Sequence, residues 1–229
     1  MDADRRCIFV TGSTGYTGRR LISRLLSQGH RVRALVRPGS EGKLPVGCQM
    51  VVGNALDAAS FESEVTPADT FVHLVGVAHP SPSKAQQFRS IDLVSGRAAV
   101  QAAVTARVQH FVYVSVAQPA PVMKAYIEVR AECERAIHQS GLNATILRPW
   151  YVLGPGHRWP YLLIPAYALL GFLPQTREGA QRLGLVSLKQ MINALADAVE
   201  NPARGFRIVE VPEIRALRDC SAKAAANAG

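Results

Sequence analysis

The sequence has no long hydrophobic run: none of its apolar stretches reaches the roughly 18–20 residues needed to span a bilayer. We also expect no signal peptide, because residues 1–6 include four charged residues and lead directly into a strand-like segment at residues 7–11. We therefore expect a protein of the cytoplasm without a transmembrane segment.

Cysteine is scarce, and its four copies are far apart at Cys7, Cys48, Cys133 and Cys220. The sequence contains no C-x-x-C pair, which argues against a disulfide framework and against a zinc cluster. The six histidines also lack the spacing of metal ligands. We therefore expect buried free thiols and no metal site.

Positive charge is abundant but not clustered. The 229-residue chain has a formal net charge of +9, yet it contains no run of five basic residues, and aromatic residues do not interleave with the basic ones. We therefore expect no nucleic-acid partner. A hydrophobic content of 48% and a charged content of 19% are typical of a folded globular chain, and the length fits one domain.

Strand-like and helix-like segments alternate along most of the chain. Apolar β-rich runs predict strands at residues 7–11, 31–37, 49–52, 70–75, 110–115, 144–148 and 206–211. Helical spacing predicts helices at residues 19–28, 58–65, 84–106, 124–140 and 187–200. This order indicates an α/β, Rossmann-type doubly wound parallel sheet with helices on both faces.

The alternation breaks after residue 149, where prolines become frequent. We therefore expect residues 1–149 to form a dinucleotide-binding core and residues 150–216 to form a small C-terminal elaboration of the same domain on the substrate side. The small and polar residues 217–229 are expected to be a disordered tail.

A glycine-rich turn lies between the first expected strand and helix. In the pattern Gly12-x-x-Gly15-x-x-Gly18, the first glycine permits a tight turn and the second lets the backbone approach a pyrophosphate. The third glycine lets the helix pack closely on the sheet, and the helix N-terminus supplies free N–H groups. The turn therefore predicts a dinucleotide site.

Several segments resemble the extended and atypical short-chain dehydrogenase/reductases. Residues 10–18 resemble the family's T-G-x-x-G-x-x-G turn, and residues 140–149 resemble its S-G-L-x-x-T-I-L-R-P signature. The family's segment after its third strand is similar to residues 51–57, its fourth strand to residues 71–76 and its fifth strand to residues 111–115. The resemblance extends over residues 6–212 and implies a nicotinamide cofactor held by Thr11, Gly12, Ser13, Thr14, Gly15, Tyr16, Gly18, Arg37, Asn54, Ala55, Val75, Gly76, Arg130 and Pro149.

The end of the second strand indicates which cofactor is preferred. NAD sites usually have an acidic residue there, against the ribose 2′-hydroxyl, whereas this chain has Arg37. An arginine can hold a 2′-phosphate, and Arg33 on the same strand face can contribute. We therefore expect NADP(H) to be favoured, with NAD(H) as the alternative. By resemblance Asn54 and Ala55 border the adenine, although Asn54 stands where the family commonly has aspartate.

The resemblance also implies a catalytic set. The family's reductases carry a Tyr-x-x-x-Lys pair on the helix after the fifth strand, and here the matching positions are Tyr126 and Arg130. Arginine keeps the positive charge but cannot relay a proton, because a guanidinium does not lose its proton in proteins. In this interpretation Tyr126 is the acid, Arg130 supplies the field and Ser115 hydrogen-bonds the substrate.

The loss of the lysine leaves two functions open. One is an oxidoreductase or epimerase acting on a small, apolar carbonyl or sugar-like substrate. The other is a cofactor-binding protein without turnover that senses redox state or assists assembly. The second is implied by resemblance to nitrogen-metabolite-repressor-like proteins and to the nucleotide-binding accessory subunit of respiratory complex I.

Residues 159–173 form a segment with almost no charge after the sixth strand. Three interpretations remain open: a lid over an apolar substrate pocket, an oligomer interface, or a peripheral contact with a membrane surface. In the lid interpretation the substrate is hydrophobic, and Trp150, Tyr151 and His157 line its pocket.

Overall fold

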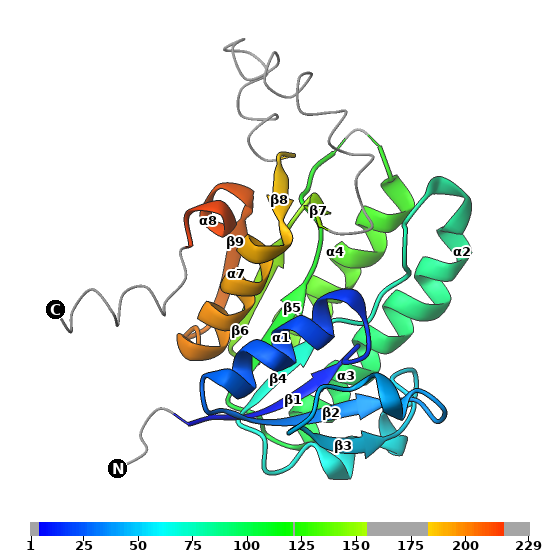
Figure 1. The fold of residues 1–229 in the computed structure, drawn as a ribbon. Coiled ribbons are helices and arrows are strands. Elements are labelled where there is room, and N and C mark those ends of the chain that lie inside the picture. Colours follow the sequence, from blue (N-terminus) through cyan, green and yellow to red (C-terminus); the bar gives the residue numbers. More distant parts are fainter. Residues whose placement is uncertain (1–4, 121, 155–182, 218–229) are drawn as a thin grey trace, which may run out of the picture.

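The computed structural model describes residues 5–120, 122–154 and 183–217. Its centre is a seven-stranded sheet in which all neighbouring strands are parallel, in the order β3-β2-β1-β4-β5-β6-β9 (Figure 1). The strands are β1 (Cys7–Thr11), β2 (Arg31–Val36), β3 (Gln49–Val52), β4 (Thr70–His73), β5 (His110–Val114), β6 (Ala144–Arg148) and β9 (Phe206–Glu210).

Helices cover both faces of the sheet. One face is packed by α1 (Tyr16–Ser27) and α7 (Leu188–Glu200), and the other by α3 (Val94–Thr105) and α4 (Lys124–Gln139) (Figure 1). The described residues also form two short helices, α2 (Ala85–Gln87) before α3 and α8 (Val211–Ala216) after β9. This architecture confirms the expected Rossmann-type doubly wound sheet.

The strands read as continuous apolar runs because both of their faces are buried. In β1 the side chain of Phe9 joins the core beneath α3 and α4, whereas Ile8 and Val10 join the core beneath α1 and α7. Successive strand residues point to opposite faces, so each strand contributes to two hydrophobic clusters.

Two helical segments differ from the expectation. The helix expected at residues 58–65 is two short 3-10 turns, Ala58–Ser60 and Glu62–Glu64, because the Asp57 carboxylate accepts from Ala59 N–H and Ser60 Oγ donates to local carbonyls. The helix expected at residues 84–106 is helical for most of its length but contains a π-helical turn at Phe88–Leu93.

A second, two-stranded parallel sheet was not predicted. It pairs β7 (Tyr151–Leu153) with β8 (Leu185–Ser187), directly after β6 and directly before α7. The predicted segment at 159–173, His157 and most of the tail at 217–229 lie outside the described residues. Among the residues that the structure does describe, no helix has both the length and the apolarity to cross a membrane.

The topology fixes where a ligand can bind. The chain passes from β1 to β2 and β3 on one side, and then returns to place β4 on the other side of β1. In open parallel sheets, ligands bind beyond the carboxyl ends of the strands at such a reversal point. A ligand-binding site is therefore expected among the residues that follow β1 and β4.

Candidate functional site

The turn between β1 and α1 requires its glycines. Gly12 has a φ of +71°, and a Cβ on it would lie 2.6 Å from the backbone carbon of Leu74 in the segment after β4. A Cβ on Gly18 would overlap the carbonyl oxygen of Gly12. The turn therefore brings the backbone of three segments into contact, as the glycine spacing predicted.

The N-terminus of α1 is open to an anion. Its N-cap residue, Gly15, provides no side-chain cap, and the first turn contains no acidic residue. The first N–H groups of a helix have no acceptor within the helix, and the helix dipole is positive there. Gly12, Thr14 and Gly15 line a cavity of about 500 Å³ at this helix end. The arrangement fits a dinucleotide diphosphate.

This cavity, called the cofactor cavity below, brings together many of the residues predicted to bind the dinucleotide. Among the residues that line it are eight of the predicted ones: Gly12, Thr14, Gly15, Arg37, Asn54, Ala55, Val75 and Gly76. No aspartate or glutamate is among the described residues that line it, and Arg37 and Lys84 are its two cationic residues. Thr11, Ser13 and Gly18 are buried and do not line it; instead Ser13 Oγ donates to the Leu35 carbonyl.

The two arginines of the second strand have different surroundings. Arg37 follows the end of β2, and its guanidinium makes no ion pair or hydrogen bond with any residue that the structure describes. Arg33 is buried within β2, where it donates to Glu64 Oε2 at 2.6 Å and to the Thr66 carbonyl. The expected contribution of Arg33 to a 2′-phosphate is therefore wrong, because Glu64 already neutralises it outside the cofactor cavity.

A second cavity of about 300 Å³, called the substrate cavity below, brings Ser115 and Tyr126 together. Tyr16 and Pro149, expected at the cofactor, line this cavity rather than the first one. Its wall contains no aspartate, glutamate, lysine or arginine among the described residues, and consists of Tyr16, His79, Pro80, Val114, Ser115, Val116, Met123, Tyr126, Pro149, Trp150, Tyr151 and Val152.

Tyr126 is a phenol in an apolar setting. Its ring packs against Phe88, with ring centroids 4.9 Å apart, and the Arg130 guanidinium lies 5.1 Å from the ring centroid. Burial raises the pKa of Tyr126, and the positive charge of Arg130 only partly opposes this rise. A phenol is already protonated at neutral pH, and this rise takes Tyr126 further from ionisation, so its hydroxyl is able to donate a hydrogen bond.

Arg130 is held by residues that the sequence did not indicate. Its Nη2 donates to Asp92 Oδ1 at 2.5 Å, and its Nη1 donates to Tyr113 Oη at 3.1 Å and to the Val114 carbonyl at 3.0 Å. Its buried Nε has no acceptor among the described residues. A Cβ on Gly76 would overlap Arg130 Nη2, so the guanidinium lies directly behind a wall of the cofactor cavity.

Asp92 is completely buried and serves two partners. One carboxylate oxygen pairs with Arg130, and the other accepts from the Val77 N–H at 3.0 Å in the segment after β4. Burial raises the pKa of Asp92, while the adjacent guanidinium of Arg130 opposes that rise. Asp92 thereby joins the π-helical turn, α4 and the wall of the cofactor cavity.

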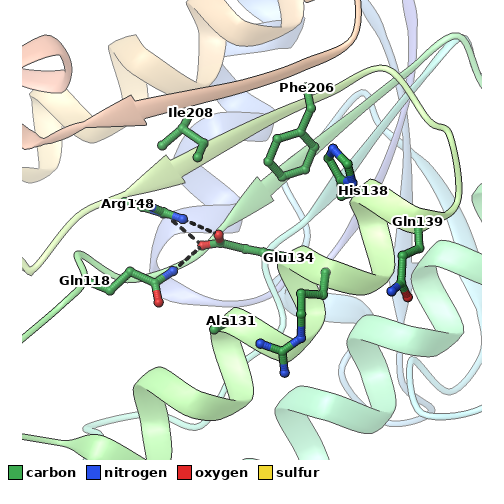
Figure 2. Close-up of a pocket in the computed structure, with 9 residues that line it drawn as sticks. Gln118, Ala131, Glu134, His138, Gln139, Arg148, Phe206 and Ile208 are labelled. Carbon is green, nitrogen blue, oxygen red and sulfur yellow. Dashed lines mark hydrogen bonds and ion pairs between the residues drawn. The ribbon is translucent and has the colours of Figure 1, made fainter.

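Ser115 is hydrogen-bonded to a buried carboxylate. Its Oγ donates to Glu134 Oε1 at 2.5 Å, and Glu134 also accepts from Gln118 and from two nitrogens of Arg148. Gln118, Glu134 and Arg148 line a groove of about 350 Å³. Figure 2 shows the side chains of Gln118 and Arg148 bonded to Glu134. The spacing of Tyr126, Arg130 and Glu134, four residues apart on one helix, was the available signal for Glu134.

His73 is a buried histidine of the core. Its Nδ1 lies 2.8 Å from Thr11 Oγ1, its Nε2 lies 3.4 Å from Ser95 Oγ, and its ring stacks on Tyr113. Burial lowers the pKa of His73 to about 3, and the charge of Arg130 adds to this shift. No group of histidine, cysteine and carboxylate side chains suited to a metal ion occurs within the described ranges.

We expect His73 to make the fold less stable in mild acid. The unfolded histidine takes up a proton near pH 6.5, whereas the folded one does so only near pH 3, so stability falls as the pH drops below 6.5. The contribution of His73 to this loss between pH 7 and pH 5 is about 2 kcal/mol. Urea unfolding should therefore depend less steeply on pH in His73→Gln, while the exposed His138→Gln should match the wild type.

Comparison with known proteins agrees with this geometry. Residues 12–158 match the model of a family described as NAD(P)H-binding. The chain is 25% identical to ceramide reductase of Caulobacter vibrioides, over 92% of this chain and 66% of that protein. It is 28% identical to protein TIC 62 of Arabidopsis thaliana, a chloroplastic protein, over 89% of this chain and 35% of that one. The chain thus spans about two thirds and about one third of these two relatives.

Among solved structures, the Bordetella bronchiseptica enzyme WbmH in complex with NAD⁺ superposes with a TM-score of 0.67 and 22% identity, covering 88% of this chain and 74% of that one. This similarity confirms the fold. The family match covers the phosphate turn, the strands from β2 to β7 and the helix of Tyr126. The chain belongs to the NAD(P)H-binding family and has the fold of the atypical short-chain dehydrogenase/reductases.

Proposed function

We propose that the protein is an NADP(H)-dependent oxidoreductase that reduces a small, largely apolar carbonyl compound. The observation that carries the cofactor preference is the guanidinium of Arg37, which has no partner among the described residues and lines a cofactor cavity without acidic side chains. A 2′-phosphate would supply the missing partner through charge-assisted hydrogen bonds.

The residues of the cofactor cavity fit this group. The N-terminus of α1 would hold the diphosphate, and Asn54 and Ala55 would border the adenine. When bound, NADPH supplies the hydride. No described residue of the cavity carries the negative charge that favours NAD(H) over NADP(H).

The protein's own residues would then supply the proton that the substrate oxygen needs. Tyr126 is protonated at neutral pH, so its Oη can donate to the substrate oxygen as negative charge develops there. The neighbouring guanidinium of Arg130 stabilises the phenolate that remains. Arg130 keeps its own proton throughout, so the phenolate must be reprotonated by another group or by water.

The wall of the substrate cavity supports an uncharged substrate. Met123, Trp150 and Val152 contribute apolar surface, and the described part of the wall has no cation to bind a phosphate or carboxylate. The relative from Caulobacter is named a reductase, which also favours reduction of a carbonyl over epimerisation.

The cofactor preference is tested by Arg37→Glu. The wild-type chain should bind NADPH at least about 10-fold more tightly than NADH, measured by calorimetry. Arg37→Glu should weaken NADPH binding about 100-fold and NADH binding less than about 3-fold, because only NADPH loses an ion pair and meets a like charge. Arg207→Glu, on the far edge strand β9, makes the same charge change and should alter neither affinity. Equal losses for the two cofactors would disprove the role of Arg37.

One observation favours a second function, an NADP(H)-binding protein without turnover. Arg130 replaces the lysine of the catalytic pair, and Asp92 already neutralises it at 2.5 Å. A guanidinium that is held in this way can support the fold without taking part in chemistry. Net oxidation of NADPH over a panel of aldehydes, ketones and quinones identifies a reductase, because a binding protein consumes no NADPH and an epimerase returns its hydride.

A further inference from the structure

Ser115 lies between the substrate cavity and a buried carboxylate. It lines the substrate cavity, and its Oγ donates to Glu134 Oε1 at 2.5 Å. A serine hydroxyl has one proton and two lone pairs, whereas an ionised carboxylate can only accept. The single proton of Ser115 is therefore directed toward Glu134, and its lone pairs remain for a molecule in the cavity.

Glu134 cannot easily turn away from Ser115. Its Oε1 also accepts from Gln118 Nε2 at 3.0 Å and from Arg148 Nε at 3.0 Å, and its Oε2 accepts from Arg148 Nη2 at 2.5 Å (Figure 2). Arg148 in turn donates to Glu210 on β9 at 3.1 Å. Glu134 is only 6% exposed, so this fork of charge-assisted bonds holds the carboxylate in place.

In the substrate cavity, Tyr126 and Ser115 are a pair with opposite hydrogen-bonding roles. The wall also contains the polar groups of Tyr16, His79, Trp150 and Tyr151. Tyr126 is a donor, since its phenol is protonated at neutral pH, and Ser115 is an acceptor. A plain ketone can accept from Tyr126, but it leaves the lone pairs of Ser115 without a donor. A molecule that carries a hydroxyl or N–H beside its carbonyl satisfies both groups, and an unsatisfied polar group in a dry cavity is costly.

We propose that Glu134 is a positioning residue that makes Ser115 a hydrogen-bond acceptor, and that the substrate cavity therefore selects a carbonyl compound with a hydrogen-bond donor next to the carbonyl. This inference rests on the proposed function and names its substrate class, an α-hydroxy or α-amino carbonyl compound. Reduction changes the carbonyl group alone, so the substrate and its alcohol product both keep the hydroxyl or N–H that donates to Ser115.

A matched set of probes tests the assignment on the full chain loaded with NADP⁺. Ligand-observed NMR would compare 2-hydroxyacetophenone with acetophenone, which lacks the hydroxyl, and with 2-methoxyacetophenone, which lacks only its proton. The wild type should bind the hydroxyl compound about 3- to 10-fold more tightly than either of the other two. Ser115→Ala should bind all three within about 2-fold of one another. A wild-type chain without the preference, or a Ser115→Ala chain that keeps it, would overturn the proposal.

The role of Glu134 is tested by Glu134→Gln. The amide can both donate and accept, so the Ser115 hydroxyl is no longer forced into one direction, and the preference should fall below about 2-fold. Glu132→Gln is the matched control, because Glu132 lies on the same helix but pairs with Arg97 at the surface, and it should keep the wild-type preference. A preference retained in a Glu134→Gln chain that binds NADPH normally would contradict the proposal.

A purely structural role for Glu134 would weaken all three probes together without changing their ratio. If Glu134→Gln fails to bind NADPH, Glu134→Asp replaces it, because the shorter carboxylate keeps its charge for Arg148 but withdraws from Ser115, with the same expected loss of preference. Probe binding with the predicted ratio but without oxidation of NADPH would support the hydrogen-bond assignment and refute the reductase.

Discussion

Replacing Tyr126 by phenylalanine should slow NADPH-dependent reduction about 100- to 10,000-fold, because a positioned proton donor contributes that much to a transition state. The substitution removes one hydroxyl from the wall of the substrate cavity and leaves the ring packed on Phe88. Tyr126 does not line the cofactor cavity, so the affinity for NADPH should stay within about 2-fold of the wild type. Steady-state kinetics and calorimetry on the same preparation measure both quantities.

Tyr113→Phe provides a control for this result. Tyr113 is a fully buried tyrosine that accepts a hydrogen bond from Arg130 but does not line the substrate cavity. Loss of the Tyr113 hydroxyl should reduce turnover less than about 10-fold. A Tyr126→Phe chain with wild-type turnover would show that the proton comes from another group, and a wild-type chain that oxidises no NADPH would favour the binding protein.

Replacing Asp92 by alanine should lower the free energy of unfolding by about 3–5 kcal/mol, because it leaves the guanidinium of Arg130 buried without a counter-charge. The side chains of Asp92 and Arg130 are 0% and 7% exposed, so water cannot replace the lost partner. The same change also leaves the Val77 N–H without its acceptor. Urea unfolding at neutral pH measures the loss.

A surface ion pair between α3 and α4 gives the comparison for Asp92. Glu132 pairs with Arg97 at the same distance of 2.5 Å, but the two side chains are 31% and 63% exposed, so Glu132→Ala should cost less than about 1 kcal/mol. The double variant Asp92→Ala/Arg130→Leu should recover much of the stability that Asp92→Ala loses, because the unpaired charge is gone. If Asp92→Ala proves as mild as Glu132→Ala, Arg130 does not depend on Asp92.

The fold and the phosphate turn were predictable because their signals are local. A parallel strand buried on both faces is a short apolar run whatever its neighbours are, and Gly12, Gly15 and Gly18 are spaced by the geometry of a single strand–turn–helix unit. The position of Arg37 directly after β2 was also predictable, because it follows from the same local pattern.

The partners of charged side chains were not predictable, because they come from distant segments. Arg33 has the strand position of a cofactor residue, yet it forms an ion pair with Glu64. Glu64 lies in a 3-10 turn, where the sequence suggested part of one helix. Asp92 lies in a π-helical turn, where the helical phase expected from the sequence does not hold. The Lys84 ammonium, which donates to the carbonyls of Ala78 and His79, was missed although these partners are local.

The position of β9 at the edge of the sheet has a consequence for the order in which the protein assembles. β9 pairs with β6 over the whole length from Ala144–Phe206 to Arg148–Glu210, although the chain between them includes everything from β7 to α7. During synthesis β9 emerges last of the seven strands, so its ladder with β6 is the last that can begin to form. Glu210 can hold Arg148 only after that step, so the hydrogen-bond chain that ends at Ser115 is completed when the sheet closes its final ladder.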